Sequence, residues 1–139
     1  MANAVQNPLS LVLKLNPGVK PGQITLFSTN TGGAVGPTTI LHFAWVVPLA
    51  ADTVLLTTVY DGDFGPYLDA FIDANPDAFN AALPLLAGAP PPPITDPANR
   101  QAFHDFVAKN NLAQSQQAVG FFSGYPEMTV IKILRCEQS

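Results

Sequence analysis

The chain has 139 residues, which suits one domain with a real hydrophobic core, and we expect residues 1–139 to form a single domain. Hydrophobic residues make up 47% and charged residues 12%, with a formal net charge of -4, so nucleic acid and anionic membranes are poor partners and burial against a second copy is favoured. The chain has one cysteine, so we expect no internal disulfide. It has no apolar run of the roughly 18 to 20 residues that span a bilayer and no signal-peptide pattern, so we expect a cytoplasmic protein.

The first half of the chain predicts three strands. Residues 9–15 are mostly apolar and end at the turn signal Asn16-Pro17-Gly18. A brief helix is predicted over residues 20–30, where apolar residues have helical spacing until glycines follow. Two more strands, residues 39–49 and 53–60, are separated by Ala50-Ala51-Asp52, which predicts an antiparallel hairpin.

The second half of the chain predicts helices and then strands. Asp61-Gly62-Asp63 supplies a turn glycine and an N-cap carboxylate for a helix whose apolar stripe is Phe64, Leu68, Phe71 and Ile72. Asn75-Pro76 ends that helix and opens a short successor, and Asp96-Pro97 is typical of the N-cap and first residue of another helix. The last strands are expected at residues 119–123 and 128–134.

This element order predicts an α+β protein with the ferredoxin-like pattern, a four-stranded antiparallel sheet with helices on one face. On the second predicted strand, simple alternation places His42 and Ala44 on one face and Phe43 and Trp45 on the other. Both faces are therefore rich in apolar residues, although a sheet covered on one side usually has a polar free face. We expect a homodimer that forms sheet to sheet.

Several stretches carry a resemblance to a known group of proteins. They are residues 9–18, His42-Phe43-Ala44, the turn Tyr60-Asp61-Gly62-Asp63-Phe64 with Tyr67-Leu68, Gly88-Ala89-Pro90-Pro91, and Phe121-Phe122-Ser123-Gly124-Tyr125-Pro126 leading into Thr129-Val130. Through them the chain resembles an uncharacterised group of bacterial proteins in the dimeric α+β barrel (ferredoxin-like) superfamily.

The resemblance implies the dimeric α+β barrel fold but no single reaction. The superfamily includes cofactor-free monooxygenases, muconolactone-isomerase-like enzymes and haem-dependent relatives, and a fold cannot choose among them. Two positions depart from the pattern. Trp45 stands where such proteins often carry arginine, and Gly124 stands where alanine is expected. The first departure argues against an anion-binding role at position 45.

The candidate catalytic residues are His42 and Asp61. The near-neutral pKa of a histidine side chain makes His42 the best general acid or base, while a lone strand histidine is more often a satisfied core or interface residue. Asp61 could pair with Asp63 as a two-carboxylate site, although a turn and a cap explain both. His104 is either a solvated helix residue or, as the sharper alternative, a proximal haem ligand.

The candidate ligand-binding residues are aromatic. Tyr60, Tyr67 and Tyr125 could aim hydroxyl groups into a cavity, and Trp45 could form a platform for a ligand, although tyrosines at strand ends are more often core or interface residues and a tryptophan is more often a core residue. The two histidines lack clustered carboxylates, so we predict no metal site, and no sequence motif indicates a cofactor.

The leading functional interpretation is a homodimeric protein that binds a small apolar molecule in a pocket between the sheet and its helices. One alternative is a cofactor-free enzyme of the oxygenase or isomerase type that uses His42 or Asp61 as its base, and another is a haem-binding, peroxidase-like protein that uses His104. The sequence leaves open whether the protein is an enzyme. Because alternation places His42 and Trp45 on opposite faces, both can line one pocket only if a second subunit completes it.

Overall fold

The computed structural model describes residues 6–24, 39–114 and 120–137. These residues contain one antiparallel sheet of three strands and four α-helices, which confirms the α+β class. The strands are β1 (Gln6–Lys14), β2 (Leu41–Ala50) and β3 (Thr53–Asp61), in the spatial order β1-β3-β2. The helices are α1 (Phe64–Ala74), α2 (Pro76–Ala82), α3 (Pro97–Asn110) and α4 (Val130–Glu137), with short 3-10 turns at Pro21–Gln23, Leu83–Leu85 and Leu112–Gln114.

The sheet follows from the alternation of apolar side chains along its strands. On β1 the buried residues are Leu9, Leu11 and Leu13, two positions apart, so that all three face the same side. The predicted hairpin is confirmed, because β2 and β3 pair in antiparallel fashion on either side of a turn at residues 51–52.

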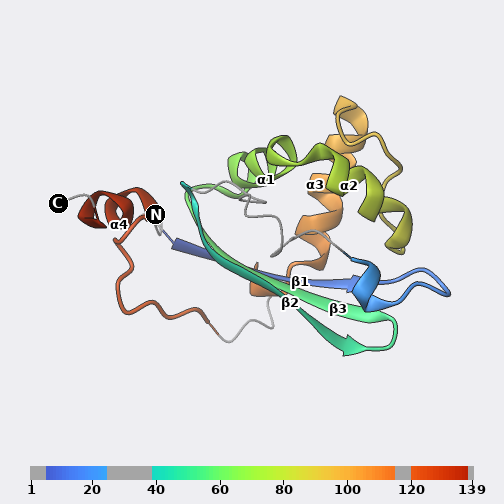
Figure 1. Ribbon diagram of the computed structural model, residues 1–139, viewed down its shortest axis with the longest axis horizontal. Coiled ribbons are helices and arrows are strands. Elements are labelled where there is room, and N and C mark those ends of the chain that lie inside the picture. The colour runs from blue at the N-terminus through green and yellow to red at the C-terminus, as the bar shows by residue number, and fades with distance from the viewer. Residues whose placement is uncertain (1–5, 25–38, 115–119, 138–139) are drawn as a thin grey trace.

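Helices α1, α2 and α3 cover one face of the sheet, and the core lies between these helices and that face (Figure 1). Each helix contributes an aromatic ring to a chain of edge-to-face contacts. The ring centroids of Phe71 and Phe79 are 6.0 Å apart, and those of Phe79 and Phe103 are 5.6 Å apart. Such pairs favour one arrangement of the helices beyond the apolar area that they bury.

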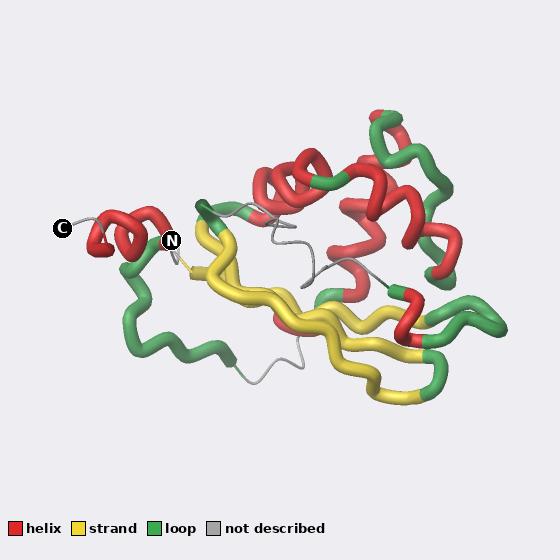
Figure 2. Tube along the Cα trace, in the orientation of Figure 1, coloured by secondary structure: helices red, strands yellow, loops and turns green. Residues whose placement is uncertain are grey.

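In the described part of the chain, no helical layer covers the other face of the sheet, which we call the open face (Figure 2). The register places its side chains in rows across the three strands: Pro8, Val59 and Phe43 in one row, Ser10, Thr57 and Trp45 in the next, and Val12, Leu55 and Val47 in a third. The large side chains on β2 are the most exposed of these, since Phe43 is 50% exposed and Trp45 is 46% exposed.

The predicted four-stranded ferredoxin-like sheet, and with it the sheet of a dimeric α+β barrel, is wrong. Residues 120–123 form no strand, residue 119 lies outside the described residues, and Val130–Glu137 is the helix α4. The apolar residues Val130, Ile131 and Leu134 fit helical spacing as well as a strand. A carboxylate oxygen of Asp61 accepts a hydrogen bond from Val130 N at 2.8 Å. This bond favours the helix over a strand, because the first N–H groups of a helix have no partner within the helix.

Several predicted boundaries also differ, and the first strand is Gln6–Lys14 where residues 9–15 were predicted. The helix expected over residues 20–30 is only the 3-10 turn Pro21–Gln23 in the described part, and residues 25–30 lie outside it. Pro-Gly pairs favour a turn over a continuing helix. The second strand begins at Leu41 and not at residue 39, because residues 39–40 form a turn. Among the described residues, no helix is both long enough and apolar enough to cross a membrane.

Candidate functional site

A groove on the open face is the best candidate for a binding site. It has a volume of about 380 Å³, and ligand pockets typically measure about 300–1,000 Å³. The sheet forms its floor through the rows of Phe43 and Trp45, and the segments after α3 and before α4 form its sides. The lining residues are Pro8, Ser10, Phe43, Trp45, Thr57, Thr58, Val59, Leu112, Ala113, Gly120 and Phe121.

The aromatic residues give the groove its chemistry. Phe43 and Trp45 are successive open-face residues of β2, and their rings stack with centroids 5.4 Å apart and an angle of 22° between their planes. Phe121 belongs to the segment before α4 and adds a third ring. Two exposed parallel rings offer a flat apolar surface on which a planar molecule can stack.

The polar groups of the groove are hydroxyls. Ser10 and Thr57 are cross-strand partners on β1 and β3, and Thr57 is in turn the partner of Trp45 on β2. A hydroxyl can donate one hydrogen bond and accept others, so this row can orient a polar atom of a ligand. Among the described residues, no charged side chain lines the groove.

His42 and Asp61 bind each other. Their side chains approach to 2.7 Å between His42 Nε2 and Asp61 Oδ1, and each is only 10% exposed. A β-bulge brings them together: Leu41 pairs with Tyr60 and Phe43 pairs with Val59, which leaves His42 as an extra residue on β2. Neither residue of the pair lines the groove.

The second oxygen of Asp61 is also occupied. Asp61 Oδ2 accepts the Val130 N–H at the start of α4, while Oδ1 contacts His42. Asp63, the possible partner of Asp61 in a two-carboxylate site, sits at the N-cap position of α1. The geometry therefore gives the His42–Asp61 pair a role in holding α4.

Tyr60 and Tyr67 are core residues. Their rings stack with centroids 3.9 Å apart, and the Tyr67 hydroxyl shares a buried hydrogen bond of 2.9 Å with Thr58 Oγ1. Burial raises the pKa of Tyr60 to about 12, with a further contribution from the negative charge of Asp63. Burial likewise raises the pKa of Tyr67 well above its ordinary value, against the opposing effect of the hydrogen bond to Thr58.

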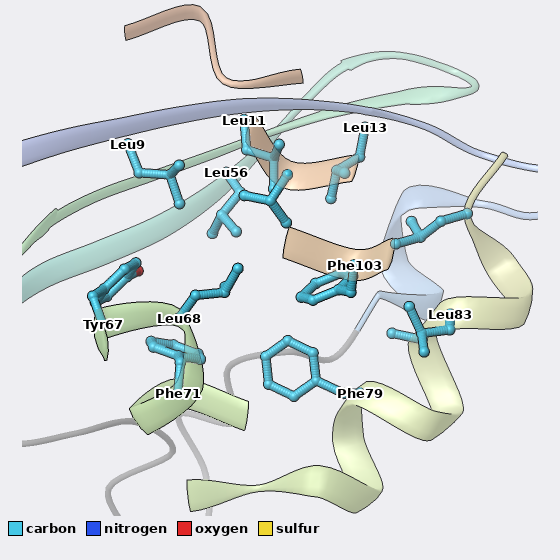
Figure 3. A pocket seen from close by; sticks show the side chains of 13 residues that line it. Leu9, Leu11, Leu13, Leu56, Tyr67, Leu68, Phe71, Phe79, Leu83 and Phe103 are labelled. Carbon is cyan, nitrogen blue, oxygen red and sulfur yellow. The ribbon is translucent and has the colours of Figure 1, made fainter. Parts of the chain in front are cut away.

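The space between the sheet and the helices is a small cavity in the core (Figure 3). Its volume is about 30 Å³, and its lining is almost entirely leucine and phenylalanine side chains, with Tyr67 as the single candidate residue among them. An apolar cavity of this size stays dry, and it is roughly a tenth of the volume that a small-molecule pocket needs. The two other tyrosine candidates and Trp45 do not line it.

His104 joins two helices. Its Nε2 lies 2.8 Å from Asp69 Oδ1 across the α1–α3 contact, and the same carboxylate oxygen lies 3.7 Å from Arg100. The ring also meets Phe64 edge-on, with centroids 6.3 Å apart. His104 lines neither the core cavity nor the groove, and its role as a proximal haem ligand stays a prediction.

Tyr125 lies in the segment before α4 and is 77% exposed. Its side chain borders a shallow hollow with Gln6 and Met128, away from the groove. Its backbone carbonyl accepts a hydrogen bond from Gln6 Nε2 at 3.0 Å. Among the described residues, no three His, Cys, Asp or Glu side chains are placed to hold a metal ion.

Of the aromatic candidates, the structure places only Trp45 in the groove. It adds Phe43, Phe121, Ser10 and Thr57, which were not among the site residues expected from the sequence. Alternation along residues 43–47 already separated Phe43 and Trp45 from Ala44, so the pair of rings could have been found from the sequence. Phe121 gave no such signal, because it comes from a segment that forms no strand.

Comparisons with known proteins give no further guidance: no family model, no curated protein and no solved structure matches this chain. The resemblance to a bacterial group of the dimeric α+β barrel superfamily therefore stays a prediction.

Proposed function

We propose that this protein is a homodimer that binds a small, uncharged, planar apolar molecule in the groove on the open face of its sheet. The single observation that carries the proposal is a groove of about 380 Å³ whose described lining contains stacked Phe43 and Trp45 and no charged side chain. The proposed pocket lies on the open face and not under the helices, because the cavity there measures only about 30 Å³.

The chemistry of the lining favours one class of ligand. A charged molecule would lose its hydration on entering the groove without meeting an opposite charge, which is costly. A flat apolar molecule replaces water against the aromatic rings, and the hydroxyls of Ser10 and Thr57 can receive one polar group. The proposal therefore favours neutral aromatic or polycyclic molecules with few polar atoms.

The homodimer is proposed from the apolar side chains that β2 leaves exposed. Beyond Phe43 and Trp45, the open-face residue Val47 is also exposed. A contiguous apolar surface of this kind is uncommon on a monomer and is typical of an interaction site. A second copy that packs its open face against this one would cover it and close the groove from the side that now faces solvent.

We further propose that the protein is cytoplasmic and does not bind nucleic acid. A net charge of -4 disfavours nucleic acid as a partner. A chain with one cysteine forms no internal disulfide, which favours the cytoplasm. An oxygenase or isomerase that uses His42 or Asp61 gains no support, because both side chains are occupied by each other and by α4.

The groove contains the only tryptophan of the chain, so intrinsic fluorescence reports on it directly. We expect N-phenyl-1-naphthylamine, a neutral planar dye, to quench Trp45 in a saturable way and to become fluorescent itself. Phe43→Ala removes one ring of the floor and should weaken binding about three- to tenfold, the usual value of an aromatic contact.

Phe122→Ala is the matched control. Phe122 is 89% exposed and does not line the groove, so its loss should leave the affinity for the dye unchanged. Equal losses in the Phe43 and Phe122 variants, or a dye that binds without quenching Trp45, would contradict the proposed site.

A further inference from the structure

The outer side of the groove does not belong to the sheet. It is formed by Gly120 and Phe121, at the start of the segment that leads to α4. In Figure 1 this segment runs along the side of the sheet opposite to α1–α3 and reaches α4 beyond the N-terminal end of β1. Because residues 120–129 contain no helix or strand, their position depends on side chains that hold them from outside.

Gln6, at the start of β1, holds this segment by three hydrogen bonds. Its Nε2 donates to the carbonyl oxygens of Tyr125 at 3.0 Å and Met128 at 2.9 Å. Its Oε1 accepts from Ser123 Oγ at 2.6 Å. Ser123 Oγ in turn accepts a hydrogen bond from the Tyr125 N–H at 3.2 Å. Residues 123–128 are therefore arranged around the side-chain amide of Gln6.

The His42–Asp61 pair holds the same segment a few residues further on. Asp61 is the cross-strand partner of Gln6, and its carboxylate binds the N–H of Val130. His42 contacts the other oxygen of that carboxylate and fixes its direction. Gln6, Asp61 and His42 thus form a polar row at one end of the open face, next to the row that contains Phe43.

We propose that Gln6 and the Asp61–His42 pair are positioning residues of the groove. None of the three lines the groove, yet they set where Phe121 stands on its outer side. The distance along the chain is short, since only Phe122 separates Phe121 from Ser123, the first residue that Gln6 binds. The inference about affinity rests on the proposed function, whereas the inference about the segment does not.

The chain offers a natural pair of reporters for the position of the segment. Trp45 is its only tryptophan and Cys136, exposed on α4, is its only cysteine. We suggest attaching a dansyl group to Cys136 and measuring energy transfer from Trp45. Dilution of labelled chains into excess unlabelled Trp45→Phe chains restricts the signal to transfer within one chain.

Gln6→Ala removes all three hydrogen bonds of the amide, and Asp61→Asn removes the charge that binds His42 and Val130. We expect energy transfer to fall in both variants. Gln101→Ala is the matched control, because Gln101 makes one exposed hydrogen bond to Asp105 within α3 and does not contact the segment. Unchanged transfer in Gln6→Ala and Asp61→Asn would overturn the proposal.

Affinity for N-phenyl-1-naphthylamine gives the second readout. Phe121→Ala should weaken binding about three- to tenfold, because it removes one aromatic ring from the groove. Gln6→Ala should have a similar effect, because it releases the segment that positions this ring. The variant that combines Gln6→Ala with Phe121→Ala should bind the dye no more weakly than Phe121→Ala alone. A residue that acts only through Phe121 has no effect on binding when the Phe121 ring is absent. Additive losses would show that Gln6 acts by general destabilisation and would overturn its positioning role.

The two proposals fail in different ways. If the dye does not bind the wild-type protein, the proposed function fails, while the energy transfer still tests whether Gln6 and Asp61 place the segment. If the dye binds and its affinity is unchanged in Gln6→Ala despite lower energy transfer, the positioning role is wrong and the proposed function stands.

Discussion

The buried tyrosine pair makes stability depend on alkaline pH. Tyr60 and Tyr67 stack in the core, and burial raises the pKa of both hydroxyls above the ordinary value near 10. In the unfolded chain both tyrosines ionise around that ordinary value, while in the folded protein they keep their protons. Above about pH 10 the unfolded state therefore binds fewer protons than the folded state, and stability falls as the pH rises.

We expect the free energy of unfolding to fall between about pH 9 and about pH 11, as measured by urea unfolding, and to fall less steeply in Tyr67→Phe. At neutral pH the same variant should be less stable by about 1–2 kcal/mol, because Thr58 Oγ1 loses its buried partner. Equal slopes for the wild-type protein and Tyr67→Phe would contradict the assignment of the buried hydroxyl.

A single residue also explains why alternation along β2 fails at one end. Counting by two places His42 on the same face as Ala44, which would turn it toward the helices. The bulge at His42 inserts one residue and reverses the count, so that Leu41 packs against the core and His42 reaches Asp61. The position of the bulge depends on the pairing with β3 and on the His42–Asp61 contact that it allows. The sequence of β2 alone does not indicate it.

At the level of the elements, the helix starts differ although their sequences look alike. Asp96 and Asp63 both stand at the N-cap of a helix. The Asp96 carboxylate accepts the N–H groups of Ala98 at 2.9 Å and Asn99 at 3.1 Å, whereas the Asp63 side chain makes no capping bond. Both were predicted as caps, and the structure shows the capping bond only for Asp96.

Substitution should separate the two aspartates. Asp96→Ala should lower the free energy of unfolding by about 1 kcal/mol, because two backbone groups of α3 lose their acceptor. Asp63→Ala should lower it by less than about 0.5 kcal/mol, the usual range for a surface position without such bonds. Chemical denaturation of both variants measures the difference, and a larger loss for Asp63→Ala would be incompatible with this account of the two caps.

The segment before α4 is the element that sequence patterns identify least well. Residues 128–134 contain apolar residues that suit a strand or a helix, and their pattern predicts a strand. In the structure, Asp61 and Gln6 bind the backbone of this segment from the sheet and open α4 at Val130. Both residues lie far away in the sequence, so local propensity could not include them.

At the level of the whole molecule, the open face predicts self-association. We expect light scattering to give the mass of a dimer. Val47→Lys should weaken association about tenfold or more, because a lysine on the apolar part of β2 would lose its hydration in the interface.

Gln101→Lys serves as the control, since this exposed position lies on α3, away from the open face. It should leave the mass unchanged. A monomeric wild-type protein at micromolar concentration, or equal effects of the two lysines, would refute association through the open face.

The sequence by itself determined the α+β class, the β2–β3 hairpin, the helices after Asp63 and Asp96, and the rings of Phe43 and Trp45 on one side of their strand. These features depend on side-chain periodicity and on turn and cap residues, which act over a few positions. Only the tertiary structure decided that the sheet has three strands in the described residues, that His42 turns toward Asp61, and that Phe121 lines the same groove as Phe43 and Trp45. Each of these depends on contacts between residues that are far apart in the chain, and a local pattern carries no information about such partners.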